Sequence, residues 1–291
     1  MRRLVIVVAA VVVGLAGGVP ARSVTIGRGF TVEAAAFPVE PAPGLNQTAL
    51  GVRPASTRIS LGHPPATAYG RAAAYDAGTI ELYTGPPPPD TVAECDTGSP
   101  NIPDEATASP AEMRLAARCD DRPAGESTAV ARSYAAAGVQ VNEMSSRAAG
   151  DGSGDAITAE ATVTVKGIAV GPLTFESVST RASVRADARA GGAVATGRTV
   201  ASGGAVNGTP VVVGPDGVDV DRQRVPLELV PSATEAVRAG LAQGGYSDVR
   251  VLQPSTEASP DGMHAAARGG GLGLYFTNNN PSENYFIRLT F

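Results

Sequence analysis

The body of the chain, from Arg22 to about Arg224, alternates apolar and polar positions with a period of two. In the clearest run, the odd positions are Ala111, Met113, Leu115, Ala117 and Cys119, and the even positions between them are mostly charged. Such alternation is typical of a strand with one buried face. A helix is the alternative, because Ser109, Pro110 and Glu112 resemble a helix start. The alternation covers more residues, so we expect a strand. Similar runs occur at Ala156–Val165, Leu173–Ala190 and Val194–Ala201.

Turn-forming residues indicate where these strands reverse direction. Val211–Val213 and Val218–Val220 flank the sequence Gly-Pro-Asp-Gly, which predicts a hairpin. Asn207-Gly208 is a second strong turn dipeptide. The glycine-rich run Gly150–Asp155 predicts a flexible loop.

The last 66 residues show a different pattern, because a helical stripe appears among the strands. Ser232 and Glu235 have the spacing of a capping box, and Gly244-Gly245 would end the helix. Val249–Leu252 and two later alternating runs predict strands. The expected fold is mainly β, an antiparallel, sandwich-like or curved sheet with one short C-terminal α-helix in a β-α-β-β end. The expected domains are a signal peptide at 1–21 and a single domain at 22–291, with a β body at 22–225 and a helix-containing part at 226–291.

The first 21 residues have the features of a secretory signal peptide. Arg2 and Arg3 precede an apolar run from Leu4 to Gly18, and Val19-Pro20-Ala21 supplies small residues for cleavage. An uncleaved signal anchor is the alternative, but several Gly and one Pro weaken the end of a run already short for a membrane span. We therefore expect export to the cell envelope or the extracellular space, with membrane contact only through this segment if it is retained.

The chain contains two cysteines, Cys95 and Cys119. An exported chain meets an oxidising environment, which favours a disulfide between them. A reactive thiol is the alternative, but no histidine lies near either cysteine in the sequence to activate it.

Composition excludes several functions. The chain has 291 residues and a net charge of −5, with no basic tract, which argues against nucleic acid as the partner. Two His and two Cys make a His/Cys-built zinc cluster unfavourable and exclude a four-Cys iron–sulfur site. We find no nucleophile elbow, phosphate-binding loop or dinucleotide motif, and nothing next to His63 or His264 marks a catalytic unit. We therefore assign no catalytic residue and no cofactor.

Three acidic residues follow the hairpin turn: Asp216, Asp219 and Asp221. Their carboxylates are weak candidates for a calcium site, although the spacing does not match the helix–loop–helix calcium pattern. The favoured interpretation is a solvated strand face.

Three segments occur in an order that resembles a known group of proteins: Gly197–Val218, Thr234–Leu252 and Gly269–Phe291. They are similar to uncharacterised secreted or cell-surface proteins of actinomycetes with variable carboxy-terminal anchors (the choice-of-anchor type). Leu61–Tyr75 is similar to an earlier part of the same group. The resemblance implies a surface location and supplies no catalytic residues. Members of the group continue past the final strand, whereas this chain stops at Phe291.

These observations predict an exported cell-envelope or cell-surface protein that is structural or mediates interactions and is not an enzyme. Its partner would be an envelope component or another surface protein. A carrier of lipid or another apolar ligand is the alternative, since a curved sheet lined by Ala and Val could form an apolar groove. A hydrolase with an unpatterned site is a third hypothesis.

Overall fold

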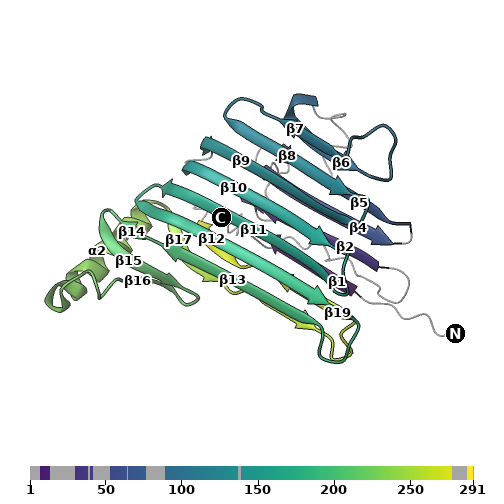
Figure 1. Ribbon diagram of the computed structural model, residues 1–291. Helices are drawn as coiled ribbons and strands as arrows, with labels where there is room; N and C mark the ends of the chain where they lie inside the picture. Colours follow the sequence, from purple (N-terminus) through teal and green to yellow (C-terminus); the bar gives the residue numbers. More distant parts are fainter. Residues whose placement is uncertain are drawn as a thin grey trace, which may run out of the picture.

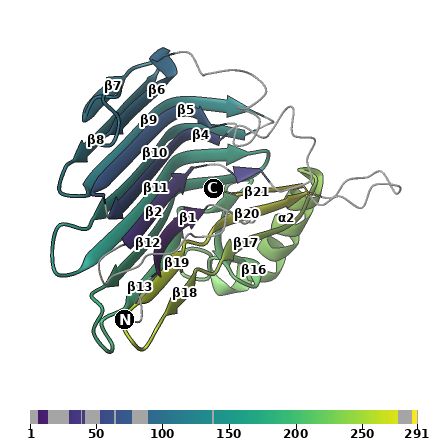
Figure 2. The same ribbon diagram turned by 90° about the vertical axis from the view of Figure 1, so that its right-hand side faces the viewer.

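The computed structural model describes residues 7–13, 30–38, 40–41, 53–63, 65–76, 89–136, 139–276 and 287–290. Most of these residues lie in antiparallel β-sheets, and one α-helix, α2 (Val230–Gln243), lies near the C-terminus of the described part. The predicted mainly β fold is therefore confirmed. Two large sheets pack face to face as a sandwich, and a smaller sheet and α2 lie at one end of it (Figures 1 and 2).

The larger sheet has ten strands, and most of them are neighbours in the sequence (Figure 1). Its central path runs from β7 to β12 in chain order, and each hairpin fixes the register of the next strand. Both β13 and β14 pair with β12, along successive parts of the same strand. The strands are β7 (Glu105–Ala108), β8 (Met113–Asp120), β9 (Ala124–Ala136), β10 (Val139–Asp151), β11 (Ile157–Val170), β12 (Leu173–Ala186), β13 (Val194–Ser202), β14 (Ala205–Val206), β15 (Thr209–Gly214) and β16 (Gly217–Val220).

The run at 111–119 forms strand β8 and not a helix, as its alternation predicts. Leu115, Ala117 and Cys119 are buried, whereas Arg114 and Arg118 on the other side of the strand are exposed. Ala111 lies in the preceding turn with a φ of 46°, a left-handed conformation that stops the strand from starting earlier. The similar runs downstream are strands β11, β12 and β13, except that β12 ends at Ala186, so residues 187–190 of the predicted run lie in the loop after it. The predicted loop at 150–155 is wrong for its first two residues, because Gly150 and Asp151 belong to β10 and pair with β9 and β11.

The second sheet has seven strands and joins distant parts of the chain (Figure 2). Its order is β18-β19-β1-β2-β4-β5-β6, so two C-terminal strands lie beside the N-terminal ones. Strand β1 pairs parallel with both of its neighbours, β2 and β19. The strands are β1 (Val7–Val13), β2 (Phe30–Phe37), β4 (Arg53–His63), β5 (Thr67–Asp76), β6 (Val92–Asp96, after the 3₁₀ turn η2 at Pro89–Thr91), β18 (Ser255–Ala258) and β19 (His264–Arg268).

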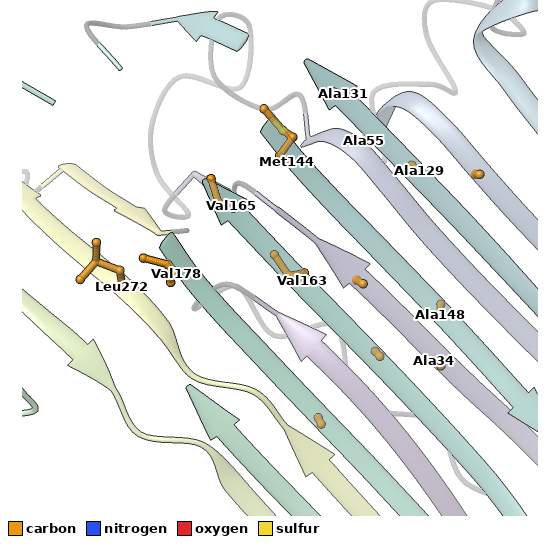
Figure 3. Close-up of a cluster of buried hydrophobic side chains, with 14 of the residues drawn as sticks. Ala34, Ala55, Ala129, Ala131, Met144, Ala148, Val163, Val165, Val178 and Leu272 are labelled. Atoms are coloured by element: carbon orange, nitrogen blue, oxygen red, sulfur yellow. The ribbon is translucent and has the colours of Figure 1, made fainter. Parts of the chain in front are cut away.

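The interior between the sheets is built from small aliphatic side chains. Strand β4 packs over β9 and β10, and β2 packs over β10 and β11. Figure 3 shows part of this interior, where side chains such as Ala34, Ala148 and Val163 lie between the layers. Glycines let the sheets approach closely: a Cβ added at Gly70 on β5 would lie 3.0 Å from Ser127 Oγ on β9, and one at Gly150 on β10 would lie 2.8 Å from Leu61 Cδ1 on β4. The sandwich is therefore thin and closely packed at these points.

The disulfide joins the two sheets. Cys95 lies on β6 and Cys119 on β8, and their sulfur atoms are 2.15 Å apart with a Cα–Cα distance of 5.7 Å. Both cysteines are buried among residues of the core. The predicted pairing is confirmed, and it is compatible with an extracellular location.

The C-terminal part contains the small third sheet and the helix. The sheet has the order β17-β20-β21-β3, formed by β17 (Tyr246–Leu252), β20 (Gly271–Phe276), β21 (Ile287–Thr290) and β3 (Glu40–Pro41). Helix α2 ends at Gln243, Gly244 is its C-cap, and the next residue, Gly245, has a φ of 78°, as the predicted glycine stop requires. The residues of the last alternating run outside β21 lie beyond the described part of the chain.

The predicted capping box is wrong in its position. The helix begins at Val230, directly after the 3₁₀ turn η3 (Leu227–Leu229), and Pro231 lies in its first turn. Because proline is tolerated there, the helix extends upstream of it. Ser232 is consequently inside the helix, where its Oγ donates to the carbonyl oxygen of Leu229 at 3.0 Å and caps no N–H.

The two predicted turns are confirmed. Asn207 and Gly208 connect β14 to β15 with φ values of 49° and 80°, which is the backbone conformation of a two-residue hairpin with positive φ at both positions. In the second hairpin, Gly214 pairs with Gly217, so Pro215 and Asp216 form the tip between β15 and β16.

Candidate functional site

The outer face of the ten-stranded sheet is a broad polar surface. Alternation turns every second residue of β8 to β13 away from the core, and the pairing register aligns these residues in rows across the strands. A depression of about 580 Å³ lies over one part of this face. We call its charged members and their neighbour Arg181 the charged face; they are Arg118, Asp120, Glu126, Arg147, Asp151, Glu160, Arg181 and Arg185.

Four residues of the charged face form a continuous chain of ion pairs across four strands. Arg147 on β10 makes a two-point contact with Glu126 on β9, with N–O distances of 2.8 and 3.1 Å. Arg147 also reaches Glu160 on β11 at 3.2 Å, and Glu160 binds Arg181 on β12. The hydrogen bonds that Arg147 donates to Glu126 raise the pKa of Arg147 above its usual value. We call this chain of Glu126, Arg147, Glu160 and Arg181 the ladder. Because each side chain is bonded to its neighbours, the ladder presents positive and negative charges in fixed positions.

Hydroxyl groups extend this polar surface beside the ladder. Ser183 and Thr196 are hydrogen-bonded at 2.7 Å, and Ser177 and Ser202 at 2.8 Å. A separate ion pair joins Lys166 Nζ and Glu143 Oε1 at 2.7 Å, and this bond lowers the pKa of Glu143.

The aromatic residues of these strands do not contribute to the face. Tyr134 and Phe175 are the aromatic residues of β8 to β13, and both pack against the core. Stacking on sugar rings or nucleic-acid bases needs aromatic side chains, so the chemistry offered here is hydrogen bonding and charge pairing. Such a face suits another polar, charged surface.

The residue types of a catalytic triad occur together at the β18–β19 hairpin, but their geometry is structural. The hydroxyl of Ser259 donates to Asp261 Oδ1 at 2.5 Å, and it accepts the N–H groups of Met263 and His264 at 3.1 and 2.7 Å. The imidazole Nε2 of His264 lies 3.6 Å from Glu257 Oε1. Acyl transfer needs a base that takes the serine proton, and here that proton is directed to Asp261. The Ser259 hydrogen bond also lowers the pKa of Asp261. This hydroxyl stabilises the turn.

The sequence did not indicate the hydrogen bonds around His264. Only the fold shows that Ser259 Oγ accepts hydrogen bonds from the backbone N–H groups of Met263 and His264. The other histidine, His63, lies beside the ring of Phe30, with ring centroids 5.9 Å apart. No pattern in the sequence links those two positions, which lie opposite each other on β2 and β4.

The three candidate calcium ligands do not converge. Asp216 is at the hairpin tip, whereas Asp219 and Asp221 each face an arginine three residues further on, Arg222 at 3.7 Å and Arg224 at 3.4 Å. Their remaining oxygens accept backbone N–H groups, from Val220 at 2.8 Å and Gln223 at 3.0 Å respectively. Among the described residues, no group of three His, Cys, Asp or Glu side chains could hold a metal ion.

On the opposite side of the sandwich, the seven-stranded sheet carries a smaller polar cluster. The phenol of Tyr69 donates to Glu94 Oε1 at 2.8 Å, and Arg71 Nε lies 3.5 Å from the same oxygen. Burial, followed by the bond to Glu94, raises the pKa of Tyr69. The opposite charges of Arg71 and Glu94 pair across β5 and β6, and Tyr69 adds a hydrogen bond to the same carboxylate.

The chain was compared with protein-family models, curated proteins and solved structures, and none of them matches. The likeness to secreted actinomycete proteins therefore stays a prediction. Within the described residues, no helix combines the length and apolar character needed to cross a membrane.

Proposed function

We propose that this chain is an exported cell-envelope or cell-surface protein that holds a polar partner against the charged face and performs no catalysis. The observation that carries the proposal is the ladder from Glu126 to Arg181, in which fixed charges of both signs span four strands. Rigid, mixed charges give specificity to protein contacts because a wrong partner leaves them unpaired. Another surface protein or a charged envelope component has the matching chemistry.

Export is supported by the leader-like sequence at 1–21 and by the disulfide between Cys95 and Cys119. Disulfides persist outside the reducing cytoplasm. This bond links the two sheets, so it stabilises the sandwich on which the charged face is built.

The proposal is tested by measuring where the chain is located and whether it is retained on the cell. A tagged chain is expressed in its own host, and intact cells are treated with a protease that cannot enter them. The proposal expects degradation of the tagged chain while a cytoplasmic protein survives. A chain that is degraded only after lysis would contradict export.

The charged face is tested in the same cells. Glu160→Lys reverses the charge shared by Arg147 and Arg181, and we expect this variant to be exported but released by washing. Glu228→Lys makes the same change at an exposed position before α2 and serves as the control, which should be retained like the unmodified chain. Equal retention of both variants would contradict a role for the charged face.

A further inference from the structure

The central part of the seven-stranded sheet contains a strand from the predicted leader. Residues 7–13 form β1, which pairs with β2 over Val8–Val13 and with β19 over Val7–Val11 (Figure 2). Cleavage after Ala21 would remove this strand and leave both of its partners in the chain. Export would therefore open a gap one strand wide inside the sheet.

The gap has two backbone edges and an apolar floor. Each edge carries the N–H and C=O groups that now pair with β1, along Val32–Phe37 on one side and His264–Arg268 on the other. Unpaired groups of this kind form a template for another strand. The interior-facing residues beside the gap are Val32, Ala34, Ala36, Ala265 and Ala267, all buried. Strands β11 and β12 contact β1 from the other sheet and form the floor.

Contacts at the hairpin loops keep the two edges apart. Closing the gap would move β19 sideways by one strand spacing, about 5 Å. The loop before β19 is bound to the loop after β12 by two backbone hydrogen bonds, from Ala188 to Gly262 at 3.1 Å and from Gly191 to Pro260 at 2.8 Å. A Cβ at Gly262 would lie 1.9 Å from the carbonyl oxygen of Arg189, so these loops fit closely together. Movement of β19 would break this contact.

We infer that the gap is a strand-accepting site that binds an extended segment of another polypeptide chain once the leader is removed. The inference rests on the proposed function, because export is what removes β1. The segment would be uncharged, rich in small aliphatic residues and parallel to β2 and β19. This chemistry follows from the strand now in place, Val-Val-Ala-Ala-Val-Val-Val, and from the alanine-rich walls. Backbone pairing on both sides supplies affinity, and the apolar floor disfavours charged side chains.

The test starts from the full chain, folded without export and carrying a specific protease site after Ala21. Cleavage leaves the leader fragment bound, and a labelled peptide of residues 2–14 is then added, with Arg2 and Arg3 keeping it soluble. The control peptide carries Ala9→Pro and Ala10→Pro, which remove two adjacent backbone donors that point to opposite sides. Anisotropy measures binding, and hydrogen exchange reports protection in β2, β19 and, as a reference for the fold, β10.

We expect the labelled peptide to replace the leader fragment and to bind about tenfold or more tightly than the control peptide. The amides at 32–36 and 264–268 that point toward β1 should lose protection when the fragment is removed and regain it with the peptide, while β10 stays protected throughout. Three results would overturn the inference: equal binding of both peptides, continued protection of β2 and β19 without a strand, as closure or a second copy would produce, or loss of protection in β10 as well.

Failure of this inference is distinguishable from failure of the proposed function. The exchange experiment uses a chain cleaved in vitro, so it is independent of the route that the protein follows in the cell. The protease treatment of intact cells tests export without reference to the gap.

Discussion

The two large sheets of the sandwich differ in how far apart their strands lie in the sequence. From β7 to β12, the ten-stranded sheet follows chain order, and each strand pairs with the one before it. The seven-stranded sheet combines residues from both ends of the chain, with β1 between β2 and β19. The first sheet can therefore keep its central register without the chain ends, whereas the second depends on them. Local pairing also forms with a smaller loss of chain entropy.

The largest expected effect comes from placing a charge at the junction of the two chain ends. Ala265 on β19 is fully buried, so Ala265→Glu should lower the free energy of unfolding by about 4 kcal/mol or more. Ala266 is half-buried on the other side of the same strand, and Ala266→Glu is the matched control. Urea unfolding of both variants checks this. Equal midpoints would show that β19 is not packed against the other sheet.

A smaller effect is expected from the bond that joins the sheets. Replacing both cysteines, Cys95→Ala with Cys119→Ala, should lower the free energy of unfolding by about 3 kcal/mol. The reason is that the unfolded chain regains the conformational entropy that the closed loop removes. A reductant should lower the stability of the unmodified chain to the level of the double variant and leave that variant unchanged. If the reductant has no effect on the unmodified chain, the disulfide does not form.

The close approach of the sheets gives a third, more local effect. A Cβ at Gly70 would meet Ser127 Oγ of the other sheet at 3.0 Å, and Cys95 Sγ and Ile59 Cδ1 of its own sheet at 2.7 and 2.8 Å. Gly70→Ala should therefore lower the free energy of unfolding by about 1–3 kcal/mol. Gly214 has nothing within 4 Å of its added Cβ, so Gly214→Ala is the control and should be nearly neutral. Thermal unfolding of the two variants measures the difference, and a neutral Gly70→Ala would mean that the side chains around Gly70 are not closely packed.

The smallest effect is a pH dependence at the edge of the charged face. Hydrogen bonds from Arg122 lower the pKa of Asp120 from 3.8 to about 2. A carboxyl group whose pKa is lowered in the folded state stabilises the fold at pH values above its pKa in the unfolded state. This contribution is lost as the pH falls from about 4 toward 2. In an NMR titration, Arg122→Ala should return the Asp120 pKa toward 3.8, whereas Arg118→Ala should change it little. The reverse order would contradict the assigned contact.

Local sequence signals predicted much of the ten-stranded sheet. The alternation at 111–119 indicates which face of β8 is buried, and Asn207-Gly208 specifies a turn through its own backbone preference. Such signals lie within a few residues of the structure that they determine. Ser232 shows the limit of such signals. Pro231 fits both immediately before a helix capped by Ser232 and in the first turn of a helix that begins at Val230, so the sequence does not decide between the two starts.

Non-local features were not predictable in this way. A run such as Val7–Val13 has the same composition as a leader or as a strand buried between parallel neighbours, so its sequence does not distinguish the two roles. The ladder was missed for a related reason. Glu126, Arg147, Glu160 and Arg181 are each an ordinary outward position of their own strand, and only the register of three successive hairpins aligns them.

Intact mass spectrometry of the protein isolated from its own host, without reductant, tests the account most directly. Removal of the leader is the step that links export to the open gap in the seven-stranded sheet. The account predicts a chain that lacks residues 1–21 and is two hydrogens lighter than its reduced form. A full-length chain with Met1 in place and two free thiols would contradict it.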